Sequence, residues 1–168
     1  MLVVACSDGR LQEATDSFLA RALGVRQYDR LYAPGGGGAL AASGREFIRA
    51  QQLRAECRFL VAAHDIEHLI LLWHGAAEHG PSEAVCADYK RKQAWATRLQ
   101  VRRQQESDVR DLVSRRHEFA GDARLACYRL EVDAAGALDV VTLHADAGAE
   151  RGDDSDIDPL RVIREKQR

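Results

Sequence analysis

The sequence predicts an α/β protein of three layers (α/β/α), in which helices cover both faces of a mostly parallel sheet. Short apolar runs rich in branched side chains alternate with segments in which apolar residues recur at helical spacing. This alternation is typical of parallel sheets, because a helix usually connects one parallel strand to the next. The chain has 168 residues, of which 46% are hydrophobic and 30% charged, so we expect one domain with a substantial core.

The charge balance and the length of the apolar runs exclude several classes of protein. Lys and Arg total 24 against 26 for Asp and Glu, and a net charge of −2 argues against a nucleic-acid partner, which needs a basic excess. The longest apolar runs are too short to span a bilayer. The opening residues lack the basic stretch and cleavage site of a secretory signal, so we expect a cytoplasmic protein with no membrane partner. Its cysteines are then expected to be reduced.

Three strands and two helices are predicted in the first half of the chain. Residues 2–5 form an apolar run typical of a buried parallel strand, and the spacing of apolar residues over 11–22 predicts the helix that follows. Residues 28–33 indicate a second strand. A long helix from about residue 44 to residue 64 then leads to a third strand over 68–73, whose apolar side chains indicate burial on both faces.

The second half of the chain is predicted to hold a long helix and a hairpin. Ser82 is the expected N-cap of the helix, whose pattern extends to His117 with a break expected near Ser107. Residues 124–132 and 138–143 read as strands. The turn residues between these strands, Asp-Ala-Ala-Gly-Ala, predict that they pair as a hairpin.

The chain is predicted to end in a tail outside the domain. An acidic run at residues 153–156 precedes a mixed, strongly charged end, a pattern typical of a solvated linker. We therefore expect an α/β domain over residues 1–146 and an acidic linker and C-terminal tail over residues 147–168.

Three unusual loops follow the predicted strands, at residues 6–10, 34–38 and 74–81. In an open α/β sheet, ligands bind beyond the carboxyl ends of the strands, at the point where the strand order reverses. Because all three loops come after strands, we expect them to meet in a single site.

The first loop carries a thiol, a carboxylate and a guanidinium at every second position, on Cys6, Asp8 and Arg10. If the segment stays extended, the three side chains point the same way. A Cys thiolate is a ligand for a soft divalent ion such as zinc, and the carboxylate can either occupy a coordination position or pair with the guanidinium. The segment therefore predicts a metal site gated by Asp8 and Arg10. The alternative is a buried cysteine beside a turn that an Asp–Arg pair stabilises.

Further metal ligands are expected from the third loop and the residues after it. His74 directly follows a buried strand, so its ring lies near Cys6 if the first and third strands are neighbours. His79 and Cys86 come later in the chain, and either can reach back toward a metal as a third ligand. The alternatives are a His74 that hydrogen-bonds the backbone and a Cys86 that belongs to the core.

The second loop contains four consecutive glycines. Gly35, Gly36 and Gly37 are candidates for binding a substrate or a small anion, because backbone N–H groups can approach a ligand closely there. The alternative is a flexible surface loop.

Residues 3–10, Val-Val-Ala-Cys-Ser-Asp-Gly-Arg, resemble the zinc-binding Cys-x-Asp-x-Arg motif of the β-class carbonic anhydrases. Residues 33–35 look like the glycine-containing loop after the second strand in that family, and residues 69–74 resemble the strand that delivers its His-x-x-Cys zinc ligands. The resemblance implies a sheet with strand order of about 2-1-3-4, closed by a C-terminal hairpin or edge strand. It also implies a homodimer with its sites at the interface.

The resemblance implies a role for four of the candidate residues. Cys6 and His74 correspond to zinc ligands, Asp8 to the exchangeable fourth ligand or proton acceptor, and Arg10 to its partner. Zinc is therefore the expected cofactor.

The sequence departs from the family pattern at the second Cys ligand. If His74 begins the His-x-x-Cys motif, the Cys position holds Ala77. Cys86, or alternatively His79, would then have to replace that ligand, because a catalytic zinc normally has three protein ligands.

Two functions of different classes follow from these observations. The first is a zinc-dependent hydratase of carbon dioxide or a similar small electrophile. The second is a zinc-free, catalytically inactive relative that binds a small anion or acts as a regulatory or interaction module, since a fold by itself does not carry an activity. A thiol-based redox or transferase activity at Cys6 is a third possibility, but no histidine is placed by sequence to act as its base.

Overall fold

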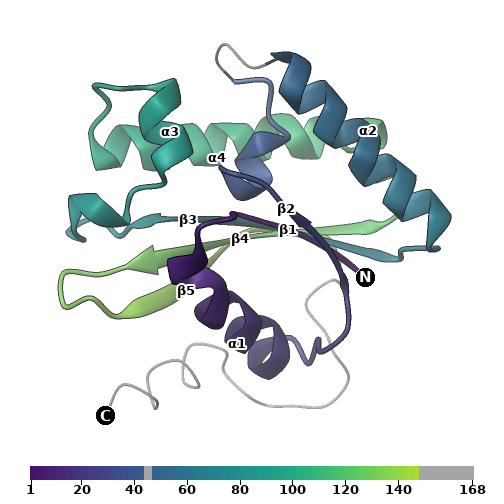
Figure 1. The fold of residues 1–168 in the computed structure, drawn as a ribbon, viewed down its shortest axis with the longest axis horizontal. Helices are drawn as coiled ribbons and strands as arrows, with labels where there is room; N and C mark the ends of the chain where they lie inside the picture. The colour runs from purple at the N-terminus through teal and green to yellow at the C-terminus, as the bar shows by residue number, and fades with distance from the viewer. Residues whose placement is uncertain (44–46, 148–168) are drawn as a thin grey trace.

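The computed structural model describes residues 1–43 and 47–147, which form one five-stranded sheet with helices on both faces (Figure 1). The strands are β1 (Leu2–Ala5), β2 (Asp29–Tyr32), β3 (His68–Ala76), β4 (Arg124–Val132) and β5 (Leu138–Ala145). Their order in the sheet is β2-β1-β3-β4-β5, and only β4 and β5 pair antiparallel. The predicted α/β class is confirmed, and the C-terminal hairpin adds an antiparallel edge strand to the expected order.

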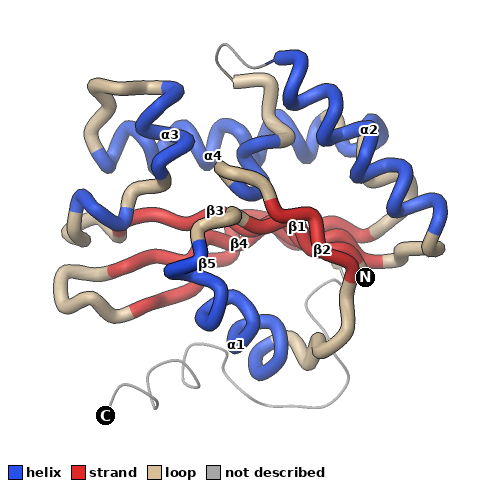
Figure 2. The backbone as a smooth tube through the Cα atoms, viewed as in Figure 1, coloured by secondary structure: helices blue, strands red, loops and turns tan. Residues whose placement is uncertain are grey.

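The helices divide between the two faces of the sheet, as Figure 2 shows. They are α1 (Gln12–Ala22) on one face and α2 (Phe47–Ala63), α3 (Ala87–Lys92) and α4 (Arg98–Ser114) on the other. Successive side chains of β1 alternate between two cores: Val3 and Ala5 pack with residues of α1, whereas Leu2 and Val4 pack with residues of α2 and α4. Burial on both faces explains why β1 and β3 read as continuous apolar runs.

The predicted helix after residue 81 is wrong in its start and its break. Residues Ser82–Ala84 form a 3-10 turn in which Ser82 makes no side-chain cap, and the helical residues divide into α3 and α4. Thr97 starts α4 instead: its side chain accepts a hydrogen bond from the Gln100 amide while the Gln100 side chain accepts one from the Thr97 amide. This reciprocal cap stabilises a new helix start, and α4 then continues unbroken through Ser107.

Two predictions near the expected site also need correction. The strand that ends at residue 73 in the prediction continues to Ala76, because β4 is long enough to pair with it as far as Val132. His74 therefore lies inside β3 rather than after it. The second loop, residues 34–38 (the glycine segment), is not an irregular surface loop, since Gly36–Ala39 form a buried 3-10 turn.

Two predictions concern the chain as a whole. Residues 148–168, nearly all of the predicted acidic tail, lie outside the described residues, so the boundary at residue 146 stays a prediction. Among residues 1–43 and 47–147, no helix has both the length and the apolar character needed to cross a bilayer.

Candidate metal centre

The site depends on β1 and β3 being neighbours, and they are. The two strands pair parallel, with Leu2 opposite Leu69 and Val4 opposite Leu71. Their carboxyl ends therefore lie side by side, which brings the residue after β1, Cys6, to the part of β3 that contains His74.

Cys86 completes a cluster with these two residues. One ligand atom each of Cys6, His74 and Cys86 lies within 4.8 Å of the others. Cys86 comes directly before α3, and the 3-10 turn Ser82–Ala84 ahead of it returns the chain toward β3. His79 is exposed and lies outside this cluster, so of the two candidates for a third ligand the structure brings Cys86 to the site.

The donor atoms suit a zinc ion. Two thiols and an imidazole are ligands that zinc prefers, and with bonds of ~2.0 to 2.3 Å, tetrahedral ligand atoms lie about 3.5 to 3.8 Å apart. The observed spread of 4.8 Å thus needs a contraction of only about 1 Å. Within residues 1–43 and 47–147, the buried His74 Nε2 has no hydrogen-bond partner, whereas buried polar atoms are normally satisfied. A metal ligand role explains that unpartnered nitrogen.

The structure around His74 holds its backbone rather than its ring. Gln105, a buried residue of α4, donates a hydrogen bond from Nε2 to the His74 carbonyl oxygen at 2.9 Å. Because β3 also pairs with β4 at His74, opposite Leu130, the sheet fixes the backbone of His74. Such outer contacts are what orients a metal ligand.

The two thiols have opposite tendencies to ionise. A hydrogen bond with Cys86 lowers the pKa of Cys6 to about 4, against the opposing effect of burial and with help from His74. The same hydrogen bond, together with burial, raises the pKa of Cys86. The pair thus shares one proton, and the shared hydrogen bond favours the thiolate form of Cys6 over that of Cys86.

Cys6 is expected to react with iodoacetamide before the other cysteines in metal-free protein, at a rate nearly constant between about pH 6 and pH 9. A pKa of about 4 leaves its thiolate fully formed over that range, whereas an ordinary thiol gains rate about tenfold per pH unit up to a pKa of roughly 8.5. Peptide mass spectrometry measures the labelling. Cys57 is the internal control, because it is buried and its pKa is raised to about 12 by that burial. Labelling of Cys57 ahead of Cys6, or a Cys6 rate that climbs steadily with pH, would contradict the prediction.

Asp8 and Arg10 form an ion pair at the edge of this cluster. The Arg10 side chain donates from Nε to Asp8 Oδ1 at 2.9 Å and from Nη2 to Asp8 Oδ2 at 2.6 Å. The segment does not stay extended after Asp8, because Gly9–Leu11 form a 3-10 turn that Asp8 caps. This turn directs the Arg10 side chain back toward Asp8. Hydrogen bonds from Arg10 lower the pKa of Asp8 to about 2. Of the two states predicted for the carboxylate, the structure shows the one paired with the guanidinium.

The glycines pack closely behind the cluster. The amides of Gly36 and Gly38 donate to the carbonyl oxygens of Ala33 and Gly35, while the Gly35 amide faces the Cys6 sulfur. All of Gly36–Ala39 is buried. These residues therefore support the first and third strands, and anion binding by Gly35, Gly36 and Gly37 stays a prediction.

Asp88 was not anticipated from the sequence. It lies two residues after Cys86, and its side chain is only 1% exposed. An acidic residue next to the basic run 90–92 looks like part of a solvated helix face. No local pattern distinguishes it from such a face, because its burial depends on α2 and on the glycine segment.

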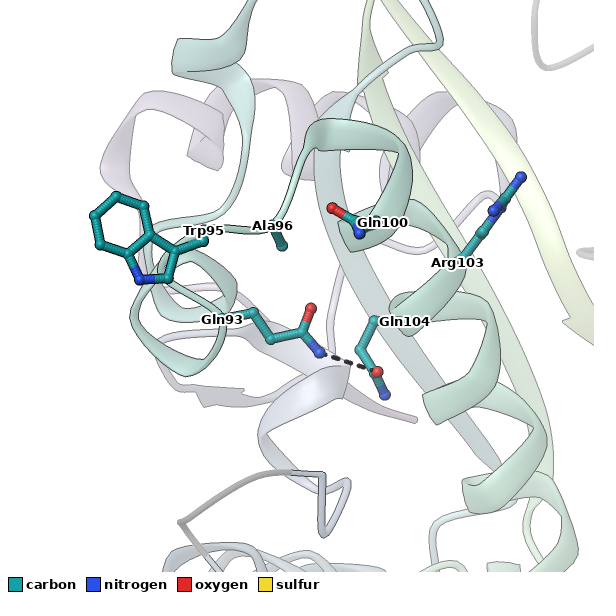
Figure 3. A pocket seen from close by; sticks show the side chains of 6 residues that line it. All are labelled: Gln93, Trp95, Ala96, Gln100, Arg103 and Gln104. Atoms are coloured by element: carbon teal, nitrogen blue, oxygen red, sulfur yellow. Dashed lines mark hydrogen bonds between the residues drawn. The ribbon is translucent and has the colours of Figure 1, made fainter.

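An open hollow of about 570 Å³ lies apart from the cluster, between the end of α3 and the start of α4 (Figure 3). Its wall contains amide side chains, an almost fully exposed tryptophan and one guanidinium, and none of the three cluster residues. The lining residues are Gln93, Trp95, Ala96, Gln100, Arg103 and Gln104.

Comparison with known protein families and with curated proteins finds no match for this chain. The candidate function therefore rests on the geometry of the site and on the resemblance of residues 3–10 to a zinc-binding motif.

Proposed function

We propose that Cys6, His74 and Cys86 bind one zinc ion, and that the protein is a zinc-dependent hydratase of carbon dioxide or a similar small electrophile. The observation that carries the proposal is the convergence of three zinc-type ligand atoms within 4.8 Å from three separate segments of the chain. A zinc ion with three protein ligands and an open position supplies a water that ionises near neutral pH, which is the nucleophile that hydration needs.

Each residue of the proposed site has a distinct role. With the metal bound, Cys6 and Cys86 would supply two sulfur ligands and His74 an imidazole nitrogen. Arg10 holds the Asp8 carboxylate in a two-pronged pair, so that Asp8 leaves the fourth position free and can accept a hydrogen bond from the water there. Because the Arg10 side chain is 66% exposed, this pair is screened by solvent and weak enough to open.

Elemental analysis of the purified protein tests the metal site. We expect about one zinc per chain, and its loss in Cys6→Ser, because serine replaces a thiolate with a hydroxyl that zinc binds poorly. Wild-type protein that is purified without chelators, lacks metal and takes up none when zinc is added contradicts the proposal. That result favours a zinc-free relative that binds a small anion.

Stopped-flow measurement of carbon dioxide hydration tests the activity. Zinc-loaded protein is expected to accelerate proton release above the uncatalysed rate, and the chelated protein is not. If the protein binds zinc but does not accelerate hydration, the proposed metal site stands and carbon dioxide is not its substrate.

The proposal also includes a cytoplasmic homodimer. The support for the dimer is the resemblance of residues 3–10 to a family built as dimers. Light scattering of the full chain measures its mass in solution, and a monomer at all concentrations contradicts the dimer without touching the metal site.

A further inference from the structure

A buried carboxylate lies beside the proposed metal centre without belonging to its ligand set. Asp88 is in the first turn of α3, two residues after Cys86, and its side chain is 1% exposed. Three cationic groups surround it: Arg91 Nη2 at 2.8 Å and Arg49 Nη1 at 3.2 Å from Oδ1, and Lys92 Nζ at 3.2 Å from Oδ2. Burying a carboxylate costs free energy unless cations compensate its charge. Three cations around this one side chain therefore indicate that the charge of Asp88 has a structural role.

Two of the cations connect Asp88 to the glycine segment. Arg49 Nη2 donates to the Pro34 carbonyl oxygen at 2.7 Å, and Lys92 Nζ donates to the Gly38 carbonyl oxygen at 3.1 Å. The carboxylate itself lies against Gly35, where an added methyl group would come within 2.5 Å of Asp88 Oδ2. Through these contacts, Asp88 connects α2, α3 and the glycine segment (residues 34–38).

These ties reach both thiols of the cluster. Cys86 immediately precedes the turn of α3 that carries Asp88, and the Gly35 amide faces the Cys6 sulfur. The two cysteines are 80 residues apart in sequence, and Cys86 lies outside the strands of the part of the chain that the structure describes. The ionic contacts of Asp88 are one connection between the segments that present them, beside the hydrogen bond from Trp73 of β3 to the Tyr89 hydroxyl of α3.

We propose that Asp88 is a positioning residue that holds Cys86 within bonding distance of the metal bound by Cys6 and His74. This inference rests on the proposed zinc site and adds to it a residue that sets metal affinity without touching the metal. Outer contacts of this kind change metal affinity about 10- to 100-fold when they are removed.

Cobalt(II) titration of the full chain, metal-free at the start, tests the inference. Cobalt bound by thiolates has a charge-transfer band whose intensity follows the number of cobalt–sulfur bonds. In Asp88→Asn we expect cobalt to bind about 10- to 100-fold more weakly, and the band per bound ion to fall to about half because one thiolate of two no longer binds. A purely structural role would lower the melting temperature and leave the band per bound ion unchanged.

Asp146→Asn is the matched control. Asp146 is also a partly buried carboxylate in an ion pair, with Arg116, and it accepts a hydrogen bond from the Leu125 amide at the far end of β4. We expect this variant to keep the cobalt affinity and the full band. If Asp88→Asn does not fold, Arg49→Gln carries the test, because it removes one tie to Asp88 and the tie to Pro34 while leaving two cations on the carboxylate.

The outcomes separate the inference from the function on which it rests. Wild-type protein with a two-thiolate band, together with a weaker and half-intensity band in Asp88→Asn, supports the inference. Equal affinity and equal band in wild type and variant overturn it and leave the proposed zinc site intact. Wild-type protein that shows no thiolate band overturns the zinc site itself, and the inference with it.

Discussion

Replacing Cys86 with serine is expected to weaken zinc binding by about 100-fold or more, whereas replacing His79 with alanine leaves it unchanged. Cys86 is buried and its sulfur lies in the cluster with Cys6 and His74, so its loss leaves two protein ligands. A catalytic zinc normally needs three. His79 is exposed and outside that cluster.

Competition with a chromophoric chelator measures both affinities. Each variant is compared with wild type at the same pH, because thiolate ligands must lose a proton to bind. Circular dichroism checks that Cys86→Ser is folded. Equal affinity in Cys86→Ser and wild type would show that Cys86 is only a core residue, and a loss in His79→Ala would identify His79 as the third ligand.

Gly36→Ala is expected to lower the free energy of unfolding by about 3 kcal/mol or more, out of a total of roughly 5 to 15 kcal/mol for a domain of this size. A methyl group at Gly36 would lie 2.2 Å from the Leu72 carbonyl oxygen and 2.9 Å from the Cys6 backbone nitrogen. Both neighbours are backbone atoms, one in β3 and one directly after β1, so displacing either would cost free energy. The φ of +56° adds strain for any residue with a side chain.

Gly9→Ala is the control for this substitution. No atom of the described residues lies within 4 Å of a methyl group added at Gly9, and Gly9 has no positive φ. The free energy of unfolding of Gly9→Ala should therefore differ from wild type by no more than about 0.5 kcal/mol. Urea unfolding followed by circular dichroism measures both variants. Equal stability of the two would mean that the glycine segment does not pack against the ends of β1 and β3 as described.

The fold class could be predicted because its signals are local. Residues 2–5 and 69–73 show as continuous apolar runs in the sequence, and such runs indicate strands that are buried on both faces of a parallel sheet. The hairpin was equally local: the Asp133 side chain accepts hydrogen bonds from the amides of Ala135 and Ala137, which makes the turn within five residues. The errors at Ser82 and Ser107 arose where several helix starts were compatible with the pattern, and the reciprocal cap at Thr97 decided between them.

The candidate site was predictable only in part. The spacing of Cys6, Asp8 and Arg10 indicated a metal-binding chemistry, and the placement of His74 followed once strands 1 and 3 were neighbours. Whether His79 or Cys86 joins them has no local signal, since both lie in the irregular stretch after β3.

The sequence by itself determined the alternation of strands and helices, the order of the elements, and the presence of zinc-type ligand residues directly after the first strand and in the last part of the third. Only the tertiary structure decided that Cys86 reaches the cluster and that Asp88 is buried among three cations. The physical reason is the separation in sequence of the residues that determine each feature. Burial and helical periodicity are read from neighbouring residues, whereas the meeting of side chains 80 residues apart depends on how β1, β3 and α3 pack against one another.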